Sequence, residues 1–300
     1  MACQRQAIVQ TCAMKLRAIV LASSACIIVA CSPSQTQRLT TPPARVQPIV
    51  VRPNLPSIAT PSIKAKSAIV IDTLTGRILF QKKARTPRAV ASTQKLLTAL
   101  CVYRAGPLSD PVTVRSTDTK VEPTKIYVST GENYTRQTLV KALLVKSGND
   151  VARVLARDVS GSQSAFVNYM NQTARALGMT QSNFKNPHGL TEKGQYSTAL
   201  DIAILAREVT KIPFYRQCMR TKEYTFTFPD GRTKVLKNTN RLLKRVPYCT
   251  GMKTGYTSAA GRCLVSSGVL RGKAVIVVTL GSTSPEIWND SVKLLKWALE

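Results

Sequence analysis

Hydrophobic residues recur with two different spacings along the chain, which divides it into strand-forming ends and a helical middle. Near the start of the body, β-branched and apolar residues fill two runs, 67–72 and 76–81, on either side of a tight Thr-Leu-Thr-Gly turn. Two such runs about a short turn predict a β-hairpin. Strand-like runs of the same composition return toward the C-terminus, at residues 253–257, 263–270 and 273–280.

Between these strands the apolar residues follow a helical period. The helical runs are 137–158, 164–177 and 197–211, and a further run at 285–299 closes the chain. Strands at both ends with helices between them predict an α+β domain. We expect one antiparallel β-sheet, built from the two ends and flanked by helices, with a helical insert.

Residues 1–31 have the character of an export signal. A basic start is followed by an apolar stretch that is too short to span a membrane as a mature helix. The stretch ends in Ile-Val-Ala-Cys, which resembles a bacterial lipoprotein box, so we expect Cys31 to be lipidated at the periplasmic face of a bacterial membrane. An ordinary cleaved signal is the alternative, and either Met1 or Met14 could be the true start.

A change in composition separates this signal from the rest of the chain. Residues 32–64 are rich in Ser, Thr, Gln and Pro, which argues against a folded core and predicts a disordered tether. A polyproline helix of this length would span roughly 100 Å at ~3.1 Å per residue. A folded body is expected at 65–300, after the tether.

The net charge favours an anionic partner. Lys and Arg total 43 against 15 Asp and Glu, a formal charge of +28. The basic residues are spread along the chain without a nucleic-acid-binding signature, so we do not expect nucleic acid as the partner. With one histidine and no Cys-x-x-Cys pair, we expect no metal and no cofactor. The sequence leaves open whether the body cysteines form disulfides or stay free, namely Cys101, Cys218, Cys249 and Cys263.

The first candidate chemistry is a Ser-x-x-Lys tetrad that opens an apolar run. Ser92 and Lys95 are three residues apart, so the first turns of a helix would place them on one face. Serine is a weak nucleophile unless a neighbouring group takes its proton, and lysine can do so only where its charged form is disfavoured. The tetrad alone is common by chance, so the interpretation depends on further motifs.

Two later motifs supply them. Ser147 and Asn149 fall where the helical periodicity is interrupted, which predicts a turn that faces a cleft with a hydroxyl and an amide. Lys253, Thr254 and Gly255 lie on a predicted strand. The glycine allows a ligand to approach the backbone closely, and the lysine and threonine can bind a carboxylate.

Together, Ser-x-x-Lys, Ser-x-Asn and Lys-Thr-Gly resemble the signature of the penicillin-recognising serine enzymes. Residues 65–283, with further blocks at 186–190 and 238–243, are similar to the low-molecular-mass serine D-alanyl-D-alanine carboxypeptidases, peptidase family S11. The resemblance implies a β-lactamase/transpeptidase-like fold. It also implies removal of the terminal D-alanine from peptidoglycan stem peptides through a serine acyl-enzyme, and inhibition by β-lactam antibiotics.

The resemblance assigns roles in the acylation. Ser92 would be the nucleophile, Lys95 its base, and Ser147 a proton relay to the leaving amine. The backbone N–H groups of Ser92 and Tyr256 would form the oxyanion hole. A lysine base needs a pKa far below ~10.4, and burial together with the like charge of Lys253 would lower it.

The remaining motif residues would hold the substrate. Asn149 would bind its backbone, and Lys253 with Thr254 would receive its terminal carboxylate. Gly255 and Tyr256 belong to the same substrate-binding strand, and Thr257 would add a hydroxyl to the carboxylate pocket.

Several alternatives remain open. A D-alanyl-D-alanine endopeptidase that cleaves cross-links has the same three motifs. A class A β-lactamase would carry Glu-x-x-x-Asn in the helical insert and Ser-Asp-Asn as its second motif, and this chain has neither. A Ser-His-Asp hydrolase would need His188, which lies in a turn-like Asn-Pro-His-Gly-Leu setting. A non-catalytic wall-binding lipoprotein is disfavoured by the intact motif residues.

Overall fold

The computed structural model describes residues 60–300. The predicted export signal, Cys31 and most of the predicted tether lie outside the described residues. Within 60–300, none of the helices combines the length and the apolar character needed to cross a bilayer.

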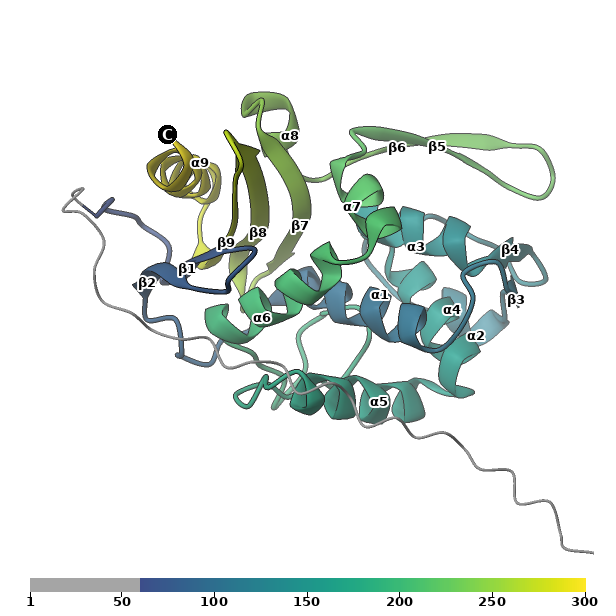
Figure 1. Ribbon diagram of the computed structural model, residues 1–300. Helices are drawn as coiled ribbons and strands as arrows, with labels where there is room; N and C mark the ends of the chain where they lie inside the picture. Colours follow the sequence, from purple (N-terminus) through teal and green to yellow (C-terminus); the bar gives the residue numbers. More distant parts are fainter. Residues whose placement is uncertain (1–59) are drawn as a thin grey trace, which may run out of the picture. The chain divides into compact units, whose positions relative to one another are not determined.

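A five-stranded antiparallel sheet organises the body (Figure 1). Its order is β2-β1-β9-β8-β7, so the two ends of the body pair in the middle, and β7 is an edge strand. The first strand pairs with the last, from Ser67 opposite Leu280 to Asp72 opposite Val275. The strands are β1 (Ser67–Asp72), β2 (Ile78–Lys82), β7 (Cys249–Thr257), β8 (Gly261–Leu270) and β9 (Lys273–Ser282). This confirms the predicted antiparallel sheet.

Helices cover both faces of the sheet. The C-terminal helix α9 packs on one face, and α6 packs on the other, behind which the other helices gather (Figure 1). The longer helices are α1 (Lys95–Arg104), α3 (Arg136–Val145), α4 (Asn149–Ser160), α5 (Gln163–Ala176), α6 (Ala199–Thr210), α7 (Pro213–Arg220) and α9 (Glu286–Leu299). The smaller elements are η1 (Ala91–Gln94), α2 (Ser116–Thr119), α8 (Leu242–Arg245), the hairpin β3 (Pro111–Thr113) and β4 (Asn133–Thr135), and the hairpin β5 (Glu223–Thr227) and β6 (Thr233–Lys237).

The alternation of side chains along β1 explains why two cores form. Ile69 and Ile71 pack into the core shared with the helical insert, whereas Ala68 and Val70 pack into the core beneath α9. Successive side chains of a strand point to opposite faces, so a strand buried on both sides is a continuous apolar run, as residues 68–71 are.

The body starts slightly earlier than the sequence predicts. Ile63 packs into the core beneath α9, and the backbone N–H groups of Lys64 and Ala65 donate to the carboxylate of Asp290 at 2.7–3.0 Å. Residues 63 and 64, predicted to belong to the tether, are therefore fixed against α9, Ile63 by packing and Lys64 by its bond to the Asp290 carboxylate.

Candidate active site

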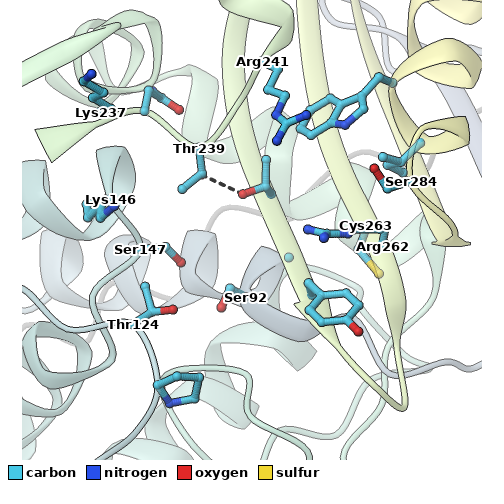
Figure 2. A pocket seen from close by; sticks show the side chains of 17 residues that line it. Ser92, Thr124, Lys146, Ser147, Lys237, Thr239, Arg241, Arg262, Cys263 and Ser284 are labelled. Carbon is cyan, nitrogen blue, oxygen red and sulfur yellow. Dashed lines mark hydrogen bonds between the residues drawn. The ribbon is translucent and has the colours of Figure 1, made fainter.

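The three sequence motifs meet where η1 and the turn between α3 and α4 face the edge strand β7. They border a cavity of about 510 Å³ whose lining includes Ser92, Ser147 and Thr254. Figure 2 shows Ser92 and Ser147 on the helical side of this cavity, across from the strands. Residues from three distant parts of the sequence thus converge on one site.

Ser92 lies in a 3₁₀ helix, not in the first turn of an α-helix as the sequence predicts. Residues 91–94 form η1, which begins at Ala91 with φ of 48°, and α1 starts only at Lys95. A 3₁₀ helix has three residues per turn, so side chains at i and i+3 eclipse. This tighter geometry brings Lys95 Nζ to 2.8 Å from Ser92 Oγ.

Lys95 is fully buried and has three polar neighbours. Its Nζ donates to Asn149 Oδ1 at 2.7 Å and to the backbone oxygen of His188 at 2.6 Å. Both partners can only accept. A neutral amine that uses its two N–H groups on them keeps its lone pair for the Ser92 hydroxyl, which is the arrangement that a proton acceptor requires.

The electrostatic surroundings favour this neutral form. The pKa of Lys95 is well below its ordinary value, chiefly because of burial and secondly because of the positive charge of Lys253, while Asp150 opposes the shift. The sequence-based expectation for the cause of the shift therefore agrees with the structure, with burial as the larger contribution.

Ser147 and Lys253 form a second buried pair. Lys253 Nζ donates to Ser147 Oγ at 2.8 Å and to the backbone oxygen of Thr254 at 2.9 Å. Its side chain is 1% exposed, and burial lowers its pKa to about 7. An amine of this pKa beside a hydroxyl can give or take a proton at neutral pH.

Asn149 and its neighbour Asp150 fix the loop on the other side of the site. The Asn149 side chain donates to the backbone oxygen of Pro123, in addition to its contact with Lys95. The Asp150 carboxylate accepts from the backbone N–H groups of Ile126 at 3.1 Å and Tyr127 at 2.8 Å. Sequence analysis did not identify Asp150 as a site residue.

Two glycines let three backbones meet at the nucleophile. A Cβ placed on Gly255 would stand 2.9 Å from Ser92 N, and one on Gly189 would stand 2.3 Å from the backbone oxygen of Ala91. Neither position admits a side chain. The backbone of β7 therefore lies directly beside the Ser92 N–H, which is what an oxyanion hole shared between Ser92 and Tyr256 requires.

The last motif residues take different places around β7. The Thr254 hydroxyl donates to Thr239 Oγ1 at 2.7 Å, and both residues line the cavity, as does Tyr256. Thr257 instead accepts from the backbone N–H of Ala260 at 3.1 Å in the following turn. Among the described residues, Thr257 and the buried Lys253 are not part of the cavity lining.

His188 contributes its backbone and not its imidazole. Its backbone oxygen accepts from Lys95, while its Nδ1 accepts from Leu190 N at 3.3 Å. Burial, followed by the charges of Lys95 and Arg153, lowers its pKa to about 3. The imidazole is not bonded to Ser92, which argues against a Ser-His-Asp hydrolase.

The cavity also contains cations that the sequence motifs do not include. These lining residues are Lys146, Lys237, Arg241 and Arg262. Figure 2 shows Arg241 and Arg262 on the strand side of the cavity and Lys146 on the helical side. Their only sequence signal is membership of a strongly basic chain, which does not single them out.

Of the four body cysteines, Cys263 lines the cavity, as Figure 2 shows. Cys101, Cys218, Cys249 and Cys263 are free and buried, so the structure has free thiols where the sequence left pairing open. Among residues 60–300, no group of three or more His, Cys, Asp or Glu side chains could hold a metal ion.

This geometry pairs a serine hydroxyl with a buried lysine of lowered pKa, and comparisons with known proteins place the chain in a family. The chain belongs to the D-alanyl-D-alanine carboxypeptidase family, peptidase family S11, whose pattern it matches over residues 55–284. It is 36% identical over 241 residues to the D-alanyl-D-alanine carboxypeptidase DacF of Bacillus subtilis, a match that covers 78% of this chain and 62% of that protein. The chain thus spans less than two thirds of the length of this relative.

Two further matches agree in sequence and in fold. The D-alanyl-D-alanine endopeptidase of Escherichia coli is 31% identical, over 79% of this chain and 78% of that protein. The crystal structure of the Streptomyces K15 DD-transpeptidase superposes with a TM-score of 0.76 at 28% identity, covering 80% of this chain and 99% of that one. These matches confirm the predicted family and fold class.

Proposed function

We propose that this chain is a serine-type D-Ala-D-Ala carboxypeptidase that removes the terminal D-alanine from peptidoglycan stem pentapeptides. The observation that carries the proposal is the position of Lys95 Nζ, 2.8 Å from Ser92 Oγ and held by two acceptors. Family membership supplies the substrate class.

Acylation begins with transfer of the Ser92 proton to the neutral amine of Lys95. The Ser92 oxygen then attacks the carbonyl carbon of the D-Ala-D-Ala bond, and the charge on the carbonyl oxygen is stabilised by the N–H groups of Ser92 and Tyr256. The proton taken by Lys95 passes to the leaving amine by way of the Ser147 hydroxyl as the C–N bond breaks. D-alanine leaves, and the peptide remains as an ester on Ser92.

Deacylation repeats the same chemistry with water. Lys95 takes a proton from the attacking water, the ester bond to Ser92 breaks, and Ser92 recovers its proton. A β-lactam antibiotic would acylate Ser92 in the same way. Because its ring opens without releasing a leaving group, the resulting acyl-enzyme would block the site.

The decisive experiment uses purified full chain with muropeptides that end in D-Ala-D-Ala. Release of free D-alanine by the wild type and its loss in Ser92→Ala would support the proposal, and fluorescent penicillin should label only the wild type. Labelling retained in Ser92→Ala would overturn the assignment of the nucleophile.

An endopeptidase is the second candidate, and a specific observation favours keeping it: a relative named as a D-alanyl-D-alanine endopeptidase covers most of this chain. Both reactions cleave after a D-alanyl carbonyl and differ in the leaving amine. Cross-linked muropeptide dimers, offered beside the pentapeptide, separate them. Activity on dimers alone would replace the carboxypeptidase by the endopeptidase.

We further propose that Cys31 carries a lipid that anchors the enzyme on the periplasmic face of a bacterial membrane, as an exported lipoprotein. The basic and apolar start of the chain and its Ile-Val-Ala-Cys end support this. A proline-rich tether would let the body reach the wall. Metabolic labelling with a fatty-acid analogue tests it: the label should disappear in Cys31→Ser, and its retention would refute the anchor.

A further inference from the structure

A substrate that ends in a carboxylate needs a cation that reaches the cavity. Lys253 was predicted to supply it, but its ammonium is bonded to Ser147 and to the backbone of Thr254, and it lies behind the cavity wall. The carboxylate partner must therefore come from the cations that line the cavity.

Among these, Arg262 has the best position relative to the hydroxyl of Thr254. In the β7–β8 register Arg262 lies opposite Tyr256, and Thr254 is two residues from Tyr256 on the same face of β7. Thr254 and Arg262 are thus diagonal cross-strand neighbours, a separation that a long side chain can span. Figure 2 shows Arg262 entering the cavity from the strand side, across from Ser92.

The guanidinium of Arg262 is oriented but not neutralised. Its Cζ lies 4.4 Å from the centroid of the Tyr256 ring, and stacking of this kind restricts the side chain without using its N–H donors. Within residues 60–300, the structure shows no salt bridge to Arg262 and no hydrogen bond from its side chain. A planar guanidinium whose N–H groups are free can donate two parallel hydrogen bonds to the two oxygens of a carboxylate.

The other cations fit this task less well. Arg241 comes from the residue before α8, outside the β7–β8 pair that carries Thr254 and Arg262, and its Cζ lies 5.7 Å from the Trp288 ring. Lys146 and Lys237 are single-point donors on flexible stems. Arg241 therefore provides a matched control: an arginine of the same cavity, also stacked on an aromatic ring.

We propose that Arg262, together with the Thr254 hydroxyl once it turns its proton from Thr239 toward the ligand, binds the C-terminal carboxylate of the substrate and makes the enzyme selective for peptides with a free terminal acid. This inference rests on the proposed function and identifies the residue that recognises the leaving D-alanine. Arg262 is a substrate-binding residue and takes no part in proton transfer.

The test compares two N-acyl peptides, one ending in D-Ala-D-Ala and one in its C-terminal carboxamide. In the wild-type full chain, kcat/KM should favour the free acid. In Arg262→Gln it should fall by about 100-fold for the acid, mainly through KM, because a paired charge is lost, and should change little for the carboxamide. Arg262→Lys should recover part of the loss, and Arg241→Gln should leave the preference intact.

Two results would overturn the proposal. One is an equal loss on both peptides in Arg262→Gln, which would indicate a structural role. The other is a loss of preference in Arg241→Gln alone. Acylation by benzylpenicillin and by its methyl ester provides a readout that does not depend on peptide hydrolysis. If Ser92 is acylated but no peptide is cleaved, the proposed function fails, and the same acid-to-ester comparison still decides the role of Arg262.

Discussion

Lys253 Nζ lies 2.8 Å from Ser147 Oγ, so a lysine of the edge strand and a serine of the helical insert share one buried hydrogen bond. The bond joins the sheet to the helical insert beside the cavity that Ser92, Ser147 and Thr254 line. It also leaves Lys253 without access to solvent, with a pKa of about 7.

This burial predicts a rise in stability with pH. Between about pH 7 and ~10.4 the folded state has released the proton of Lys253 while the unfolded state retains it, so the unfolded state binds more protons and the free energy of unfolding rises with pH. In Lys253→Gln the slope should fall by up to about 1.4 kcal/mol per pH unit. Guanidinium unfolding at pH 7, 8 and 9 measures it. The wild type and Lys253→Gln both contain Lys95, so a difference between their pH slopes is due to Lys253. Equal slopes would contradict the low pKa of Lys253.

Replacement of Lys95 should abolish acylation without unfolding the protein. Lys95→Met removes the proton acceptor, and Lys95→Arg supplies a group that stays protonated. Loss of a general base typically costs 10²–10⁴-fold, so penicillin acylation should slow by about 10³-fold in both variants. Circular dichroism checks the fold.

The matched control is Lys211→Met, which alters an exposed lysine paired with Glu208 on the surface. It should acylate at the wild-type rate. Wild-type acylation by Lys95→Arg would show that another group accepts the Ser92 proton.

Gly189 should be intolerant of alanine. A Cβ there would meet the backbone oxygen of Ala91 at 2.3 Å, and φ is 87°, so the new methyl group must displace the backbone that carries Ser92. We expect a loss of about 2–4 kcal/mol in the free energy of unfolding and slower acylation. Gly161→Ala is the control, because Gly161 also has positive φ, of 76°, but open space around it.

For the control we expect a loss of about 1 kcal/mol and unchanged acylation of the folded protein. Thermal unfolding and penicillin labelling measure both effects. Equal effects of the two substitutions would mean that backbone strain, and not contact with Ala91, sets the requirement for glycine.

The four body cysteines should resist alkylation in the folded protein. All are buried and free, and burial raises their thiol pKa values, to about 12 for Cys101 and Cys218 and about 11 for Cys263. Iodoacetamide at pH 8 followed by peptide mapping should leave them unmodified until guanidinium is added. Cysteines that react only after a reductant is also added would instead be disulfide-bonded.

The sequence predicted the strands of the main sheet because those depend on local pattern, whereas the convergence of the three motifs was expected from their resemblance to a known family. The continuous apolar run predicts β1, and the helical period of the apolar residues predicts α5. In both elements the apolar residues that form the pattern are largely the residues that are buried. Ser92 and Lys95 are close in sequence, so their contact also follows from local spacing.

Other structural features depend on contacts between residues that are far apart in the sequence, which a local pattern of apolar and polar residues does not contain. Gly189 and Gly255 approach the backbone of η1, although they lie about 100 and 160 positions away from it in the sequence. The burial of Lys253 depends on Ser147. The β5–β6 hairpin was not predicted, although β5 alternates exposed polar residues with the half-buried Tyr224 and the buried Phe226.

Burial, which excludes water, is the largest cause of the low pKa of Lys95. In the proposed mechanism, the reactivity of Ser92 would therefore depend on how dry the cavity floor stays. Any change that admitted water to Nζ would raise the pKa of Lys95 and weaken it as a proton acceptor, even with every motif residue in place. A substrate that displaced water from above Ser92 would have the opposite effect.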